Sequence, residues 1–228
     1  MELAARIRAV NVGRAGAIRR GDEEIKTAFL KQPVDGALPL RELGFDGDEH
    51  VYEFHGGPDK AVLVYSHDNY AFWRDQHGLD LPESAAFGEN LTVEGITEET
   101  VHLGDVFDVG TAVVQVTQPR APCFKIAARY GVGKMSLYVQ QTGYTGILFR
   151  VLEEGQVRAG QELRLRSRLS HGISVAAANR VLNVDRRDLD GAFQLLSTPD
   201  LPRLLQVDLE RRLEAGGFGE DRERLFGE

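Results

Sequence analysis

The sequence predicts a mainly β protein with helices, an α+β fold in which a β-rich domain over residues 1–168 precedes a small three-helix domain over residues 169–228. Two observations predict this class. Alternating apolar and polar residues, typical of strands with one buried face, recur as far as Arg168. Beyond Arg168, apolar residues take a helical spacing behind capping residues. A chain of 228 residues is long enough to bury a substantial core.

The expected strands follow one another along the first domain. A strand over residues 4–12 leads into a loop over 13–24, and a second strand ends at the turn of residues 33–36. Period-two patterns then predict strands at 38–43 and 61–65, a hairpin of 101–109 with 112–117, and another hairpin of 146–152 with 161–166. In that last strand Arg164 and Arg166 are expected to face solvent.

Helices are expected in both domains. Within the first domain they are predicted at residues 67–78, 126–130 and 135–142. In the second, Ser174 caps a helix over 175–182, Asp188 caps a helix over 189–196, and Pro202 opens a helix over 203–215. Because no glycine-rich linker precedes these helices, they are expected to pack against the β-rich domain. Nothing in them indicates a site.

Charge and composition narrow the class of protein. A net charge of −8 argues against a general affinity for nucleic acid or for an anionic membrane. No apolar run is long enough to span a bilayer and the start lacks a signal-peptide pattern, so a cytoplasmic location is expected. The single cysteine excludes an intramolecular disulfide and any zinc site built from several cysteines.

The most informative stretch is Gln118-Pro-Arg-Ala-Pro-Cys-Phe-Lys125, which holds that cysteine. A thiolate is the nucleophile and the soft-metal ligand, and nearby Arg or Lys lowers a cysteine pKa toward that state. Arg120 and Lys125 are placed for this role, and the two prolines indicate a rigid loop at a strand end. A free cysteine is often only a small buried hydrophobe, and that alternative stays open for Cys123, although its charged neighbours favour chemistry.

A second informative stretch, His55-Gly-Gly-Pro-Asp-Lys60, lies between two apolar runs. Paired glycines let the backbone approach a ligand, and their N–H groups can bind an anion. A plain tight turn with a solvated lysine is the alternative. Asn90, in the turn of residues 87–91, can bind a ligand through its amide or simply close the loop.

Five motifs in a fixed order resemble one known family. They are Gly47-Asp48, His55-Gly-Gly-Pro-Asp-Lys60, Gly88-Glu-Asn-Leu91, Gly104-Asp105 and Gln118-Pro-Arg-Ala-Pro-Cys-Phe-Lys125. The chain resembles the MOSC family, named for the C-terminal domain of molybdenum cofactor sulfurase, and within it a stand-alone bacterial branch. The resemblance covers about residues 1–168, and the three-helix tail is similar to the small C-terminal domain of that branch.

This resemblance implies a MOSC-type β-barrel that binds a molybdenum–pterin cofactor (Mo-molybdopterin), with Cys123 as thiolate ligand to molybdenum. It also implies an oxidoreductase that reduces N-hydroxylated compounds, including detoxification of hydroxylaminopurine-type base analogues. Pyridoxal phosphate binding is not expected. A soft thiolate suits a molybdenum centre, while the protein supplies binding, orientation and local charge.

The same resemblance implies a set of binding residues. Arg120 is expected to bind the pterin phosphate bidentately, with Lys60 and Lys125 as point charges. The remaining expected cofactor-binding residues are His55, Gly56, Gly57, Asn90, Lys31 and Thr27. His55 is the candidate catalytic proton donor, with a structural role as the alternative. Residues 65–70 depart from the usual Tyr-Pro-Arg-Glu-His-Tyr of the branch, so no role is carried over to Asn69.

Partners follow from the same reasoning. The substrate is expected to be a small N-hydroxylated molecule, and electrons are expected from an external donor protein, because one cysteine cannot hold an iron–sulfur cluster. A homodimer is expected only from the general frequency of twofold assemblies. Two other functions stay open: a cofactor carrier without turnover, and a metal-free thiol enzyme, which requires a base near the sulfur of Cys123.

Overall fold

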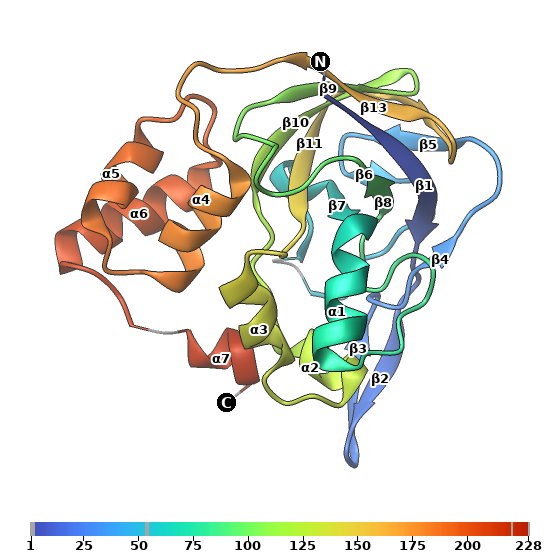
Figure 1. The fold of residues 1–228 in the computed structure, drawn as a ribbon, viewed down its shortest axis with the longest axis horizontal. Helices are drawn as coiled ribbons and strands as arrows, with labels where there is room; N and C mark the ends of the chain where they lie inside the picture. Colours follow the sequence, from blue (N-terminus) through green and yellow to red (C-terminus); the bar gives the residue numbers. More distant parts are fainter. Residues whose placement is uncertain (1–2, 53–54, 220, 228) are drawn as a thin grey trace.

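Seven strands close into a barrel (Figure 1). The computed structural model describes residues 3–52, 55–219 and 221–227. Neighbouring strands follow the order β13-β9-β10-β11-β7-β8-β1, and β1 pairs with β13 to complete the ring. Their bounds are β1 Ala4–Val12, β7 Val62–Ser66, β8 Leu91–Glu94, β9 Val106–Val109, β10 Ala112–Pro119, β11 Ile147–Glu153 and β13 Glu162–Ser167. The pairing of β7 with β8 is parallel and the other pairings of the ring are antiparallel, so the predicted mainly β fold with a barrel is confirmed.

Shorter strands extend this barrel. β4 (Gln32–Pro33) pairs with β1, and β5 (Leu38–Arg41) lies between β6 (Gly44–Phe45) and β12 (Gly155–Val157). The loop expected over residues 13–24 was wrong, because β2 (Gly16–Arg20) and β3 (Glu23–Thr27) form a hairpin there. Ile18 pairs with Ile25 across that hairpin and both are buried, whereas most of the charged residues beside them are exposed. Two isoleucines among charges were too weak a pattern to predict these strands.

Two further strand predictions need correction. The hairpin expected from residues 146–152 and 161–166 does not form, because β11 pairs with β10 and β7 while β13 pairs with β9 and β1. Closure of the barrel separates the two strands, and β12 lies between them in the chain. The strand expected over 101–109 begins only at Val106, and Leu91, expected in a turn, begins β8.

The helices of the first part lie where they were predicted. A short 3-10 turn, η3 (His67–Asn69), leads into α1 (Tyr70–His77), and α2 (Phe124–Tyr130) and α3 (Met135–Thr142) follow β10. Another 3-10 turn, η2 (Pro58–Lys60), precedes β7. Each of the three α-helices ends at a glycine in the left-handed region, which relieves the strain that a side chain would suffer there.

The C-terminal part holds one helix more than predicted. α4 (Val175–Asn179) continues into a π-helical turn, η4 (Arg180–Val184), and is followed by α5 (Leu189–Leu196) and α6 (Arg203–Ala215). Ser174 and Asp188 cap α4 and α5 as expected, by accepting hydrogen bonds from backbone N–H groups. The additional helix is α7 (Arg222–Phe226), within the charged tail. Figure 1 shows it against α3, away from the other C-terminal helices.

Two groups of buried side chains hold the molecule together. The larger extends from the barrel interior into the C-terminal helices, where Ala178, Leu195 and Leu209 belong to it, so these helices pack on the barrel as predicted. The smaller contains aromatic and aliphatic side chains and includes Tyr65 of β7 and Trp73 of α1. The division into two domains after Arg168 stays a prediction.

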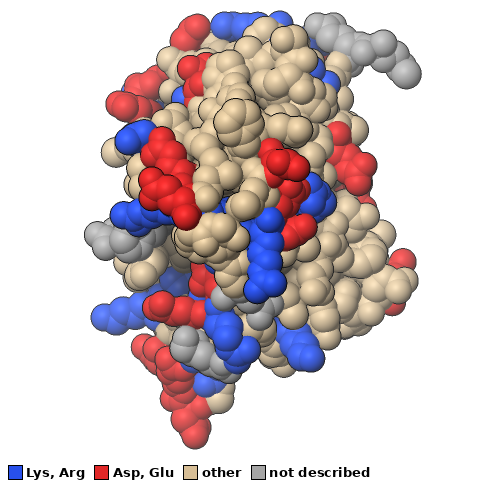
Figure 2. Space-filling view, turned by 90° about the vertical axis from the view of Figure 1, so that its left-hand side faces the viewer, with Lys and Arg blue, Asp and Glu red and all other residues tan. Residues whose placement is uncertain are grey.

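The outer surface of the helical side carries mixed charges. Figure 2 shows acidic and basic side chains interspersed on this face. Within residues 3–52, 55–219 and 221–227, no helix is long and apolar enough to cross a membrane.

Candidate functional site

Cys123 lies between the end of β10 and the first residue of α2. The thiol-bearing residue is half-buried, and its backbone is extended. Its carbonyl oxygen accepts hydrogen bonds from Ser136 Oγ (2.7 Å) and from the N–H of Ile126 (3.1 Å). The loop is therefore fixed from α2 and from α3, and the cysteine is neither in the core nor fully in solvent.

Arg120 carries a buried donor that nothing in the described chain satisfies. Its backbone N–H donates to the carbonyl of Gly146 (3.0 Å), which anchors the residue at the barrel rim. Its Nη1 atom is buried without a hydrogen-bond partner among the described residues. Burial is the main cause that lowers the pKa of Arg120, and the negative charge available at Cys123 opposes that shift. A buried guanidinium nitrogen without a partner is costly, so this atom indicates a place for an anionic ligand.

Lys125 adds a second buried cation. It lies in the first turn of α2, is buried, and forms no ion pair with an acidic residue in the part of the chain that the structure describes. Its Nζ lies 5.6 Å from the ring centroid of Tyr52, a weak cation–π contact. Such a contact does not replace the hydration of an ammonium group, so Lys125 also suits an anionic ligand.

The environment of His55 shows that these cations converge. Loss of solvent around the imidazole, followed by the positive charges of Lys125, Arg120 and Lys60, lowers the pKa of His55 to about 4. Although the residue as a whole is exposed, protein atoms crowd its ring, and Tyr52 stacks edge-on with a centroid distance of 5.2 Å. The structure thus brings together four residues that the sequence predicted, and at neutral pH the imidazole is uncharged.

The two glycines after His55 have different physical reasons to be glycine. Gly57 has φ 104°, in the region that side chains disfavour, and its carbonyl accepts the N–H of Lys60 (2.9 Å) to close η2. At Gly56 a Cβ atom would stand 2.7 Å from Cδ2 of His50. The segment is therefore a close-packed turn, and it presents Lys60 beside the barrel strand β7.

Lys31 and Asn90 belong to a neighbouring group built around Asp48. Lys31 Nζ pairs with Asp48 Oδ1, and the two side chains are 6% and 2% exposed. Asn90 Nδ2 donates to Asp48 Oδ2 (2.8 Å), and Asn90 Oδ1 accepts the N–H of Leu63 (3.1 Å). The N–H of Gly13 is a further donor to Asp48 (2.7 Å). The side chains of Lys31 and Asn90, which the sequence predicted to bind a cofactor, are therefore already bonded within the protein.

Thr27 lies further from this network. It is buried at the end of β3, and its Oγ1 accepts the N–H of Phe29 (3.1 Å). The hydroxyl thus stabilises the turn that leads to Lys31 and is not bonded to the residues around Cys123. Its predicted role in binding a cofactor stays a prediction.

His50 links the Asp48 group to the Cys123 side. Burial lowers the pKa of His50, while the charge of Asp48 raises it and that of Lys31 lowers it. Its ring packs on Gly56, and its charge acts on His55. The sites around Cys123 and around Asp48 are therefore adjacent parts of one polar region.

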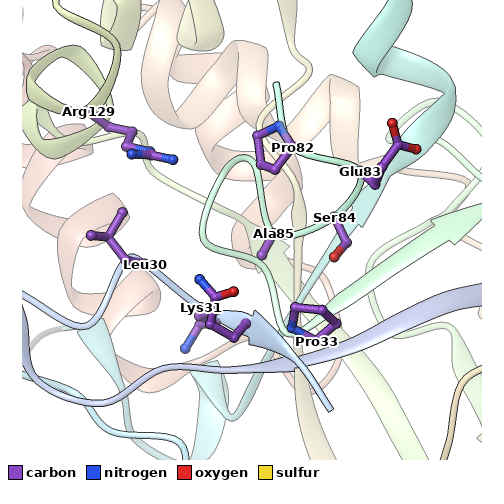
Figure 3. Close-up of a pocket in the computed structure, with 9 residues that line it drawn as sticks. Leu30, Lys31, Pro33, Pro82, Glu83, Ser84, Ala85 and Arg129 are labelled. Atoms are coloured by element: carbon purple, nitrogen blue, oxygen red, sulfur yellow. The ribbon is translucent and has the colours of Figure 1, made fainter. Parts of the chain in front are cut away.

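A hollow of about 190 Å³ opens beside Lys31 (Figure 3). Its lining residues are Leu30, Lys31, Gln32, Pro33, Pro82, Glu83, Ser84, Ala85 and Arg129. Figure 3 shows the guanidinium of Arg129 directed across the hollow from α2, opposite Pro82. Arg129 is one helical turn beyond Lys125, so both cations lie on the same face of α2.

Sequence reasoning missed Asp48, His50 and Arg224. Asp48 was only part of a motif, and the tail was not associated with any site. No local pattern could reveal Arg224, because its partner, the carbonyl of Pro122, lies 102 residues away. Asn69, to which no role was assigned, is buried and donates to Glu98 (3.2 Å).

The part of the chain that holds the site matches a known domain. The model of the MOSC domain matches residues 51–164, a range that contains Cys123, Arg120, His55 and Asn90. The chain belongs to the MOSC domain family. This membership confirms the resemblance drawn from the motifs and is consistent with an oxidoreductase related to the molybdenum cofactor.

Relatives within the family cover most of the chain. YflK of Bacillus subtilis is 48% identical over 82% of this chain and 85% of its own length. Protein YiiM of Escherichia coli is 36% identical over 93% of this chain and 96% of its own. A protein of Gibberella moniliformis named Reductase is 33% identical over 87% of this chain, which spans only 36% of that protein.

Solved structures agree with the fold. The crystal structure of YiiM from Geobacillus stearothermophilus superposes with a TM-score of 0.77 at 31% identity, over 92% of this chain and 99% of that one. The crystal structure of a hypothetical protein superposes with a TM-score of 0.81 at 33% identity, over 100% of this chain and 97% of that one. The barrel with its C-terminal helices is thus an arrangement that solved structures share.

The residues present fit a molybdenum–pterin group. Among the described residues no cluster of three or more His, Cys, Asp or Glu side chains could bind a metal ion by itself. A metal carried by its own organic ligand needs only one thiolate from the protein, and Cys123 is the residue that would supply it. The partnerless Nη1 of Arg120 and the buried Nζ of Lys125 suit the phosphate of such a group.

Proposed function

We propose that this chain binds the molybdenum cofactor through Cys123 and catalyses the reduction of N-hydroxylated compounds. The observation that supports this proposal best is the buried Nη1 of Arg120, which lacks a hydrogen-bond partner among the described residues. The guanidinium of Arg120 also interacts electrostatically with Cys123. A donor of this kind is stabilised when an anion occupies the space before it. Membership of the MOSC domain family supports the identity of that anion.

The chain's own residues divide the work of binding. Arg120 and Lys125 neutralise the phosphate end, with Lys60 as a third positive charge beside them. Gly56 and Gly57 keep the neighbouring backbone free of side chains. A second group of side chains stabilises the neighbouring segments of the chain. Asp48, before β7, pairs with Lys31, before β4, and accepts a hydrogen bond from Asn90, before β8.

The proposed reaction converts R–NHOH, two electrons and two protons into R–NH₂ and water. The bound cofactor would supply the centre that accepts electrons and passes them to the substrate. The described residues include one cysteine, so the electrons come from a partner protein. The name Reductase of the Gibberella relative, which is much longer than this chain, supports a redox role.

His55 is the proposed proton-handling residue. With its pKa lowered to about 4, the imidazole is neutral at pH 7 and accepts a hydrogen bond or a proton. Burial of the imidazole is the largest cause that lowers this pKa, and the positive charges of Lys125 and Arg120 come after it. An anion bound to these two cations would cancel their contribution, and so would raise the pKa of His55 and favour proton donation.

The deciding experiment is metal and pterin analysis of protein purified gently from a host that makes the molybdenum cofactor. Wild-type protein is expected to contain nearly one molybdenum and one pterin per chain. Cys123→Ser is expected to lose the metal while its circular dichroism spectrum stays unchanged. Ser136→Ala serves as a matched control, because it removes the hydroxyl that binds the carbonyl of Cys123 and leaves the thiol present.

The same samples distinguish the alternatives. Protein that holds molybdenum but reduces no hydroxylamine with a strong artificial reductant, and passes its cofactor to an apo-enzyme, is a carrier. Activity in protein from cells unable to make molybdopterin indicates a metal-free thiol enzyme. Absence of metal and pterin from both wild-type protein and Cys123→Ser contradicts the proposal.

A further inference from the structure

The C-terminal helix α7 contacts the residues on both sides of Cys123. Arg224, in α7, donates from Nη1 to the carbonyl oxygen of Pro122, the residue before the cysteine. At the residue after it, the ring of Phe124 packs against the chain end: a Cβ atom at Gly227 would stand 3.2 Å from Cγ of Phe124. One contact from α7 and one from Gly227, the residue after it, thus lie on the two sides of Cys123.

Arg224 also ties this contact to the rest of the molecule. Its Nη2 donates to Oε1 of Gln140 in α3 (2.8 Å), and its Nε donates to Asp221 at the start of α7 (3.3 Å). Its side chain is only 20% exposed, and burial lowers its pKa, an effect that Asp221 and Cys123 partly oppose. One planar guanidinium therefore joins the cysteine loop, α3 and α7, a geometry that a lysine cannot reproduce.

A second arginine holds the opposite side of α7. Arg20, in β2, donates from Nη1 to the carbonyl of Phe226 (3.0 Å), and its guanidinium carbon lies 5.2 Å from the ring centroid of Phe124. β2 and α7 both pack against α2, the helix that follows the cysteine loop. The β2–β3 hairpin, α2 and α7 are therefore in mutual contact beside that loop. The segment before α7, Gly216 to Gly219, is hydrogen-bonded to Arg186 through the N–H of Phe218 and the carbonyl of Gly219, so the contacts of Arg20 and Arg224 position the helix beyond that anchor.

We propose that α7 is a latch that sets the position of Cys123, with Arg224 as its positioning residue. The latch deepens the proposed function, on which it rests only for the identity of what Cys123 binds. Docked, α7 holds the backbone carbonyl of Pro122 and packs with its following residue, Gly227, against the ring of Phe124, and so fixes the direction of the thiol between them. Released, it leaves the loop with the hydrogen bonds that Ser136, Ile126 and Gly146 make to it among the described residues.

The test uses the 228-residue chain without cofactor. Hydrogen exchange measured by mass spectrometry on fragments covering residues 119–126 reports the loop, and fragments covering residues 112–118 report β10. Charge-assisted hydrogen bonds typically contribute about 1.5 to 3 kcal/mol, so Arg224→Gln is expected to speed exchange in the loop by about tenfold or more. Exchange in β10 is expected to stay within about twofold of wild type, because the barrel does not depend on α7.

Matched variants separate positioning from general stability. Arg224→Lys is expected to restore part of the protection, because an ammonium can donate to the carbonyl of Pro122 but cannot also bridge to Gln140. Glu223→Gln, an exposed neighbour in the same helix, is expected to leave exchange unchanged. Arg20→Gln releases the other side of α7 and is expected to loosen the same fragments, so the latch stays testable even if Arg224→Gln does not fold.

A second measurement concerns the loaded protein. Molybdenum content after extended dialysis is expected to fall in the order wild type, Arg224→Lys, Arg224→Gln. Unchanged loop exchange in both Arg224→Gln and Arg20→Gln would overturn the latch, as would a uniform increase throughout the barrel. Wild-type protein that contains no molybdenum would instead contradict the proposed function, while the exchange result would still decide whether α7 positions Cys123.

Discussion

Lys31 and Asp48 form an ion pair inside the molecule, with side chains 6% and 2% exposed. Asp48 also accepts hydrogen bonds from Asn90 and from the backbone of Gly13. One carboxylate thus joins the segments that follow β1, precede β4 and precede β8. The pair lies beside His50 and the hollow of Figure 3, so the same side chains support the polar region around Cys123.

Removal of Asp48 is therefore expected to destabilise the fold. Asp48→Ala leaves the ammonium of Lys31 buried without a partner, which typically costs about 3 to 5 kcal/mol of the free energy of unfolding. Urea denaturation measures this loss. The double variant Lys31→Met with Asp48→Leu is expected to recover much of it, because no buried charge remains. A loss below about 1 kcal/mol in Asp48→Ala would show that the pair is not buried as described.

Removal of Arg120 is expected to leave the stability of the cofactor-free protein intact, unlike removal of Asp48. Arg120→Met removes a buried guanidinium nitrogen that has no partner, so the cofactor-free protein should be as stable as wild type, or more stable by about 1 kcal/mol. Molybdenum retention should fall at least about tenfold, the effect of losing one charge-assisted bond. Arg168→Met is the matched control, because Arg168 pairs with the buried Asp105 at 2.6 Å and its removal should destabilise. A large loss of stability in Arg120→Met would contradict the ligand-binding role.

His55 is expected to titrate with a pKa of about 4 in the cofactor-free protein. Since the ordinary value is 6.5, the unfolded chain binds more protons than the folded protein between these values, and stability falls as pH drops through that range. NMR titration of the imidazole measures the pKa. Lys125→Met or added inorganic phosphate should raise it, because each reduces the positive charge around the ring. Stability of His55→Gln should depend less on pH in this window, and a pKa unchanged by both treatments would refute the convergence of the cations.

Gly56 and Gly57 are expected to respond differently to alanine. Gly56→Ala places a Cβ against the ring of His50, so the His50 resonances should shift and cofactor retention should fall. Gly57→Ala has open space around its Cβ but a φ of 104°, so it should cost about 1 to 2 kcal/mol of stability through backbone strain. NMR of the histidines and urea denaturation distinguish the two effects. Unshifted His50 resonances in Gly56→Ala would contradict the close packing.

Much of the barrel could be predicted because its strands carry their own alternating patterns. β1, β7 and β10, together with α2 and α3, lie at the residues expected for them. The β2–β3 hairpin could not be predicted, because Ile18 and Ile25 are the only buried apolar residues in it. The sequence also could not predict the pairing of β13 with β1 and β9, since this pairing depends on closure of the whole barrel.

The sequence by itself determined the chemistry available at the site: one cysteine, with an arginine three residues before it and a lysine two residues after it, between a strand and a helix. These residues are close in the sequence, so they stay close in space whatever the rest of the chain does. Only the tertiary structure decided which polar groups are already satisfied. Asp48 occupies Lys31 and Asn90 across separations of 17 and 42 residues, whereas Arg120 keeps a buried nitrogen unpaired among the described residues. A buried polar group bonds to whichever partner the fold places beside it, and that partner often comes from a distant segment of the chain.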